Sequence, residues 1–189
     1  MSVHSGNTPS RERSEFWGGN HPWVTAKDMK STVLVDSQIR LSDLGLRAAS
    51  VAPTGSVLML TRGMTLFKDV PVCLVGRELA FNQDIKMLKV GPQLDSVFLA
   101  YYLISRKARL MRLVDASGHG TGRLGTDALL SFRVSFPNLP EQRRIGALLS
   151  QWDTAVTRAD AVLRDLRGAY ARQGKSLMAA LLSDGSAGG

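Results

Sequence analysis

Apolar residues follow one long regular pattern between Pro140 and Leu182. They recur at alternating steps of four and three residues, which is the 3.5-residue period of a coiled-coil seam. Pro140 suits the first turn of a helix, where its missing N–H would have no partner anyway. We therefore predict one helix over residues 140–182, roughly 60 Å long at the helical rise per residue. The seam positions are Ile145, Leu149, Trp152, Val156, Ala159, Leu163, Leu166, Tyr170 and Leu177.

The predicted helix needs a partner along this seam. A hairpin packed against the chain's own domain is the competing interpretation, but most of so long a rod would extend beyond a domain of about 140 residues. We therefore expect another polypeptide to cover the seam. Residues 183–189 are small, polar and rich in glycine, and we expect them to form a disordered tail.

Residues 1–139 show shorter patterns, which predict one α/β (α+β) domain with a mixed, short-stranded sheet. Four glycines within residues 116–125 predict a flexible polar loop, and such loops often carry function. Trp17 and Trp23 flank a Gly-Gly pair that we interpret as a turn, and we expect the two aromatic rings to cover an edge of the core. Helices are expected at 42–49, 95–114 and 127–130, and strands at 23–25, 57–60, 71–75 and 132–136, with one or two more in 79–90.

Length and composition limit the possible architectures. A chain of 189 residues with 44% hydrophobic content can form one core and an appendage, rather than two ordinary domains. Cys73 is the only cysteine, so an intrachain disulfide is excluded and a reducing compartment is expected. No apolar run is long enough to cross a bilayer. We predict a cytoplasmic protein with no membrane partner.

The net charge of +8 is spread over both parts of the chain. Residues 1–140 contain 17 Lys/Arg against 11 Asp/Glu, and residues 141–182 contain 7 against 4. Such an excess favours a polyanionic partner, most often nucleic acid. Charge alone leaves open a protein that is merely basic. The cations Arg106, Lys107, Arg109 and Arg112 lie near the end of a predicted helix, and its dipole explains them better than DNA contact does.

Common catalytic signatures are absent from the sequence. It contains no phosphate-binding glycine loop, and its three histidines are too far apart to indicate a metal site. One weak pattern remains, in which Asp69, Asp84 and Lys86 resemble the carboxylates and lysine of Mg²⁺-dependent nucleases. We keep a nuclease using these three residues as the alternative to a non-catalytic function.

Several short motifs together resemble one family. The sequence LPEQRRI at 139–145, with Trp152 and Asp153 after it, is similar to the opening of the long helix in specificity subunits of type I restriction-modification systems. Motifs similar to that family's target recognition domain precede it in the same order, so the match spans residues 5 to about 182. These motifs are 5–10, 16–19, 22–25, 27–29, 61–63 and 81–84.

The resemblance implies a non-catalytic DNA-recognition subunit with a recognition domain at 1–139. In that family the long helix packs antiparallel against its counterpart, methyltransferase subunits dock on this scaffold, and a restriction subunit can join. S-adenosylmethionine and Mg²⁺ would then belong to the partner subunits, leaving this chain without a cofactor. The family usually has two recognition domains and two helices, whereas this chain has one of each. The resemblance therefore implies a half-subunit that works as a homodimer on a bipartite site.

Two further points follow from the resemblance. The family usually has a tryptophan-led strand before its Gly-Asn-Thr-Pro motif, and its absence here indicates a truncated or rearranged domain. A remnant that binds only the methyltransferase subunits is therefore a further alternative. Flexible side chains with hydrogen-bonding groups would contact bases, and lysines would contact phosphates. The predicted base contacts are Thr61, Arg62, Asn82, Gln83, Lys86, His119, Thr121 and Arg123, and the predicted phosphate contacts are Lys27, Lys30 and Lys68.

A purely structural role is the alternative at two of these places. Asn82 and Gln83 can form a satisfied turn, and Arg62 with Gly63 can form the turn that ends a strand.

Overall fold

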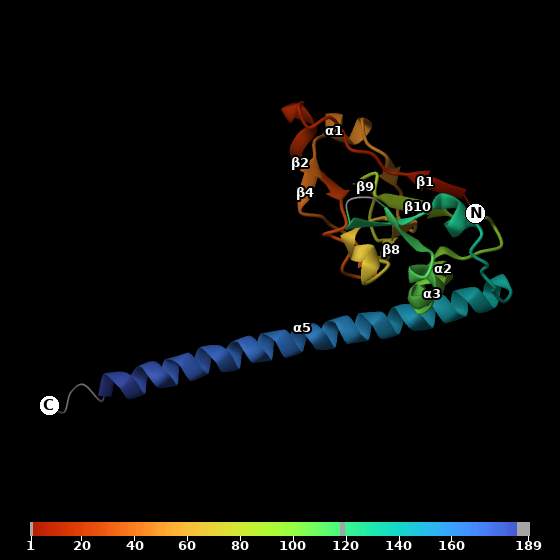
Figure 1. Cartoon of the computed structure of the whole chain (residues 1–189). Coiled ribbons are helices and arrows are strands. Elements are labelled where there is room, and N and C mark those ends of the chain that lie inside the picture. The colour runs from red at the N-terminus through yellow and green to blue at the C-terminus, as the bar shows by residue number, and fades with distance from the viewer. Residues whose placement is uncertain (1, 118–119, 185–189) are drawn as a thin grey trace. The chain divides into compact units, whose positions relative to one another are not determined.

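The structure is a computed structural model that describes residues 2–117 and 120–184 (Figure 1). The chain divides into two compact units, residues 1–147 and residues 148–189. The first unit is a mixed α/β domain, and the second consists of the greater part of one long helix.

The domain builds three small sheets from its described residues. The five-stranded sheet has the order β1-β10-β6-β8-β3, with bounds Ser2–Ser5, Ile85–Lys89, Val57–Leu60, Val72–Val75 and Val33–Leu34. The four-stranded sheet has the order β4-β2-β9-β5, with bounds Ile39–Leu41, Trp17–Val24, Leu79–Phe81 and Val51–Ala52. The three-stranded sheet has the order β11-β12-β7, with bounds Val114–Ser117, Thr121–Leu124 and Arg62–Gly63. Two strand pairs, β2 with β9 and β3 with β8, are parallel and the others antiparallel, so the predicted mixed class is confirmed.

Short helices cover and connect the sheets. They are η1 Ser14–Phe16, α1 Asp43–Arg47, η2 Met64–Phe67, α2 Ser96–Ser105, α3 Lys107–Met111 and α4 Thr126–Leu130. All residues of β6 and β8 are buried, as expected for strands covered on both faces. Helix α2 packs on these strands through Leu99, Ala100 and Leu103. The core therefore lies between α2 and the middle of the five-stranded sheet.

The strand predicted at 132–136 is wrong. This segment is irregular, although Phe132 and Val134 pack on the core and Arg133 and Ser135 are exposed. The alternation that resembled a strand comes from a segment that packs Phe132 and Val134 on the core but pairs with no strand. Alternation of apolar and polar residues indicates that every second side chain is buried, but it does not show whether the backbone is hydrogen-bonded to another strand.

Three other predictions need correction. The loop expected at 116–125 is largely the hairpin of β11 and β12. The Gly-Gly pair is not a turn, because it lies inside β2, where the pairing with β4 shifts register between Trp17 and His21. The helix expected at 95–114 divides at Arg106 into α2 and α3, although Asp95 caps it as expected. Strands β1, β3, β4, β5 and β7 were not predicted, because they are short and because each one pairs with a strand from another part of the chain.

The long helix α5 spans Leu139–Asp184 and confirms the predicted helix. Asn138 begins it, because its side-chain oxygen accepts a hydrogen bond from the backbone N–H of Glu141 at 3.1 Å. Its first turns belong to the domain unit, which ends at residue 147. Ser183 and Asp184, predicted to be tail, are helical, and residues 185–189 lie outside the described part of the chain.

Candidate nucleic-acid interface

The segment around Gly6 and Asn7 holds several loops of the domain together. The backbone N–H of Asn7 donates to the carbonyl of Phe81 at 3.1 Å, and the Asn7 side-chain amide donates to the carbonyl of Ala48 at 2.8 Å. Gly6 lies so close to the carbonyl of Asn82 that an added Cβ would overlap it. This sequence motif is therefore structural, and it fixes the loop at 81–84.

The loop at 81–84 is a satisfied turn. Asn82 is 8% exposed, and its amide donates to a carboxylate oxygen of Asp84 at 3.2 Å. Thr61 is 5% exposed, and its hydroxyl donates to the carbonyl of Asp84 at 3.1 Å. The structural alternative considered for Asn82 thus matches its geometry. Gln83 at the tip is exposed, and its side-chain oxygen accepts from the hydroxyl of Thr8 at 2.5 Å.

A polar hollow of about 210 Å³ lies beside this turn, and we call it the basic hollow. Arg62 of β7 and Arg123 of β12 occupy paired positions of the three-stranded sheet, and Lys86 comes from β10. The Lys86 ammonium donates to the hydroxyl of Ser5. The lining is Thr61, Arg62, Gln83, Lys86, Arg123, Leu124 and Thr126. Five residues predicted from sequence to contact bases therefore meet in one place.

Among the described residues, two other predicted base contacts, Asn82 and Thr121, do not line this hollow. Thr121 is half-buried on β12, two residues before Arg123. His119 lies outside the described residues. Lys68, a predicted phosphate contact, is exposed directly after η2.

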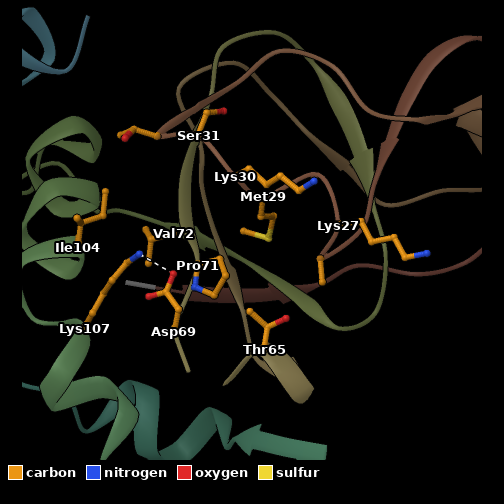
Figure 2. Close-up of a pocket in the computed structure, with 12 residues that line it drawn as sticks. Lys27, Met29, Lys30, Ser31, Thr65, Asp69, Pro71, Val72, Ile104 and Lys107 are labelled. Carbon is orange, nitrogen blue, oxygen red and sulfur yellow. Dashed lines mark hydrogen bonds and ion pairs between the residues drawn. The ribbon is translucent and has the colours of Figure 1, made fainter. Parts of the chain in front are cut away.

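A second hollow, of about 550 Å³, contains the remaining two predicted phosphate contacts. Figure 2 shows the exposed Lys27 and Lys30 at one side of it and the ion pair between Lys107 and Asp69 at the other. The Lys107 nitrogen lies 2.9 Å from the Asp69 carboxylate. Lys107 therefore neutralises the Asp69 carboxylate in this hollow. The exposed Lys27 and Lys30 make one side of the hollow positively charged.

The residues of the nuclease alternative do not gather into one site. Asp69 lines the second hollow and pairs with Lys107, whereas Lys86 lines the basic hollow. The carboxylate of Asp84 accepts from Asn82. Within residues 2–117 and 120–184, no group of three or more His, Cys, Asp or Glu side chains could hold a metal ion. The geometry gives no support to Mg²⁺-dependent cleavage.

One polar residue that the sequence patterns did not indicate holds the start of the long helix within the first unit. Gln142 is fully buried, and its side-chain amide donates to the carbonyls of Gln93 at 3.0 Å and Pro137 at 2.8 Å. Its side-chain oxygen accepts from the backbone N–H of Asp95 at 2.8 Å. The sequence contains no clear signal for this role, because Gln142 lies among charged residues in the first turn of the helix, where an exposed polar residue is expected.

Two other features were also missed. Arg11 stacks on the rings of Trp17 and Trp23 at 5.3 and 5.6 Å, and the two rings meet edge to face. Burial raises the pKa of the Cys73 thiol to about 12, so this cysteine is an inert part of the core.

The second unit displays an apolar stripe along α5. Trp152 is 68% exposed and Tyr170 is 74% exposed, and the large side chains between them on the predicted seam are similarly exposed. Ile145 is half-buried in the domain unit, and the side chain of Leu177 lies outside the described residues. We call this set the helix stripe: Leu149, Trp152, Val156, Ala159, Leu163, Leu166 and Tyr170. Among the described residues, no helix is long and apolar enough to span a membrane.

Comparison with known proteins agrees with the resemblance. Residues 1–160 match the family described as the type I restriction modification DNA specificity domain. The chain is 28% identical over 154 residues to the specificity subunit of the type I restriction enzyme EcoR124I/EcoR124II of Escherichia coli, covering 80% of this chain and 38% of that one. It is 27% identical over 160 residues to the MjaIX specificity subunit of Methanocaldococcus jannaschii, covering 82% and 36%.

Solved structures show the same fold. The HsdS subunit from Thermoanaerobacter tengcongensis matches 84% of this chain with a TM-score of 0.56 and 19% identity. A type I S subunit from M. genitalium matches 83% with a TM-score of 0.58 and 17% identity. The chain covers 37% of each of those two chains, so it spans less than two fifths of the length of these relatives.

Proposed function

Because the chain belongs to the type I restriction modification DNA specificity domain family, we propose that it recognises a DNA sequence and catalyses no reaction itself. The observation that supports this function is the basic hollow, where Arg62, Arg123 and Lys86 gather beside the exposed Gln83. Arginine matches the acceptor edge of guanine and glutamine matches adenine. The two arginines of the basic hollow are exposed. The lining of the hollow contains no carboxylate that could pair with them.

Phosphate contacts would position the domain on the duplex. Lys27, Lys30 and Lys68 are exposed, and ammonium groups of this kind bind phosphates without reading the sequence. The net charge of +8 supports the same contact through the release of counterions from DNA.

The helix stripe would join two copies of the chain. It places several large apolar side chains on one face of α5 in contact with water, which is costly unless another surface covers them. Trp152 and Tyr170 are the largest of these, and the alternating four- and three-residue spacing of the stripe suits knobs-into-holes packing. A homodimer supplies an equal and complementary stripe.

The residues beside the stripe favour an antiparallel pair. One flank is apolar, with Leu148 and Val162, and the other contains Asp160 and Arg167. Antiparallel pairing places each flank beside the same flank of the partner, so Asp160 and Arg167 can pair reciprocally. Parallel pairing would place these charges beside the partner's apolar flank, at the cost of their hydration.

A two-fold dimer would bind a bipartite DNA site. The two recognition domains would read an inverted repeat, with a spacer set by the paired helices. Methyltransferase subunits would dock on this scaffold and contribute S-adenosylmethionine chemistry, and a restriction subunit could join them. A chain that binds only the methyltransferase subunits is the competing function.

Selection from a randomised duplex library on the purified full chain, followed by fluorescence anisotropy, tests DNA recognition. We expect Arg62→Ala and Arg123→Ala each to weaken binding of the selected DNA about 5- to 100-fold. Arg77→Ala is the control, because Arg77 is exposed beyond β8, at the end of the sheet opposite Thr61. Co-expression with methyltransferase subunits and mapping of methylated adenines should return the same sequence. Failure of the chain to enrich any sequence would refute the proposal.

Light scattering at micromolar concentration tests the dimer. We expect twice the chain mass of 20.5 kDa for the natural sequence and a single chain mass for Leu163→Asp. Ala161→Asp places the same charge on the opposite face of α5 and should leave the dimer intact. A strict monomer would exclude the homodimer while leaving DNA recognition open.

A further inference from the structure

The segment 62–68 displays two large apolar side chains beside the basic hollow, and we call it the reading loop. Met64 is 73% exposed and Phe67 is 48% exposed, both in the short helical turn η2. Two large apolar side chains exposed in the same turn need a physical explanation, because apolar groups normally pack into a core when one is within reach.

The reading loop is held firmly by the domain. Leu66, between the two exposed residues, is 1% exposed and packs against Gly122 of β12, where an added Cβ would lie 2.9 Å from the Leu66 Cβ. The backbone N–H groups of Lys68 and Asp69 both donate to the carbonyl of Thr65 at 2.9 Å. The outward position of Met64 and Phe67 is therefore fixed by the fold and is not the result of a loose loop.

The charges around the loop favour a polyanion. Arg62 begins it and Lys68 ends it, and both are exposed. The segment contains no acidic residue, and the next carboxylate, Asp69, is paired with Lys107. Arg62 also pairs in register with Arg123, so the loop begins at the wall of the basic hollow. Lys68 at one end would contact a phosphate at the rim of a DNA groove, and Arg62 at the other end would contact a base edge, so the apolar pair between them would face the bases.

We propose that Met64 and Phe67 contact the 5-methyl groups of thymines in the DNA half-site read by this domain. This inference rests on the proposed function and adds a specific base to it. The major groove exposes donors and acceptors on every base pair, but the thymine methyl is its only apolar group. Burying an apolar side chain against that methyl is favourable, whereas burying it against a donor or acceptor leaves that group unpaired.

Deoxyuridine provides the test, because it pairs like thymine and lacks only the methyl group. In the DNA selected by the full chain, each thymine is replaced in turn, and binding is measured for the natural chain and for Met64→Ala/Phe67→Ala. Leu44→Ala, on the exposed face of α1, is the matched control for loss of a surface apolar group. Thermal melting of each variant confirms that the fold is retained.

We expect replacement of one or two specific thymines to weaken binding by the natural chain about 5- to 10-fold. The double variant should lose roughly tenfold on thymine DNA and show no further loss on the corresponding deoxyuridine DNA, because the two changes remove the same contact. Binding of unselected DNA should change less than about twofold, and Leu44→Ala should behave as the natural chain does.

Other results would overturn the inference. Equal binding of thymine and deoxyuridine DNA by the natural chain excludes a methyl contact. If the double variant weakens binding while 2-aminopurine in the site becomes brighter in the natural complex, the two residues act as a wedge between bases. Loss of methyltransferase binding with unchanged DNA affinity would make the loop a protein-docking surface. In all three cases DNA recognition stands, whereas a chain that enriches no DNA refutes the proposed function itself.

Discussion

Replacing Gln142 should separate the start of the long helix from the domain. Its side chain makes three hydrogen bonds to backbone groups of Gln93, Asp95 and Pro137, and it is fully buried. Gln142→Leu keeps a side chain of similar size but removes all three bonds. The three backbone groups then lose this hydrogen-bond partner.

The expected cost follows from these contacts. A net hydrogen bond contributes about 1 kcal/mol, and a buried group left without a partner costs roughly 1–3 kcal/mol. At a net value of about 1 kcal/mol for each bond, loss of the three bonds costs about 3 kcal/mol of domain stability, which is a large share of the ordinary stability of a domain. Gln151→Leu, at an exposed position of the same helix, should change stability by less than about 0.5 kcal/mol.

Urea unfolding followed by tryptophan fluorescence measures this difference. Trp17 and Trp23 report on the domain, and a Trp152→Phe background removes the signal of the long helix. We expect a lower midpoint for Gln142→Leu with an unchanged slope. A change within about 1 kcal/mol of the natural sequence would show that the glutamine does not attach the helix to the domain.

Three further predictions follow from the structure. Gly6→Ala should lower the melting temperature, because its Cβ would overlap the carbonyl of Asn82, whereas Gly174→Ala meets no neighbour and should increase helicity by circular dichroism. Cys73 should resist iodoacetamide until the domain unfolds. The pKa of its thiol rises from 9.0 to about 12 on folding, so the folded state holds the proton more tightly than the unfolded state does. The free energy of unfolding should therefore fall as the pH rises from about 9 to about 12. Purified chain with Mg²⁺ should leave DNA intact, and cleavage that Asp84→Ala abolishes would instead establish the nuclease alternative.

Much of the fold could be predicted because its signals are local. The 3.5-residue period of the long helix is a property of one segment, and it correctly predicted both the helix and its apolar face. The buried strands β6 and β8 are short apolar runs, and their character depends little on which strands pair with them. The strand predicted at 132–136 failed because alternate burial of Phe132 and Val134 requires only a nearby core, not a paired backbone.

The candidate site could be predicted only in part. Sequence patterns identified Arg62, Gln83, Lys86 and Arg123 as residues suited to DNA, because their chemistry is independent of position. Their gathering in one hollow depends on pairing between β7 and β12, which lie about 60 residues apart in the chain.

The sequence alone thus determined the long helix, its apolar seam, the mixed class of the domain and the residues with chemistry suited to DNA, since each depends on local order. Only the tertiary structure decided that Asn82 and Thr61 are buried supports, that Gln142 attaches the helix, and that Met64 and Phe67 face outward. These outcomes depend on which distant backbone groups become neighbours, and no local pattern of residues contains that information.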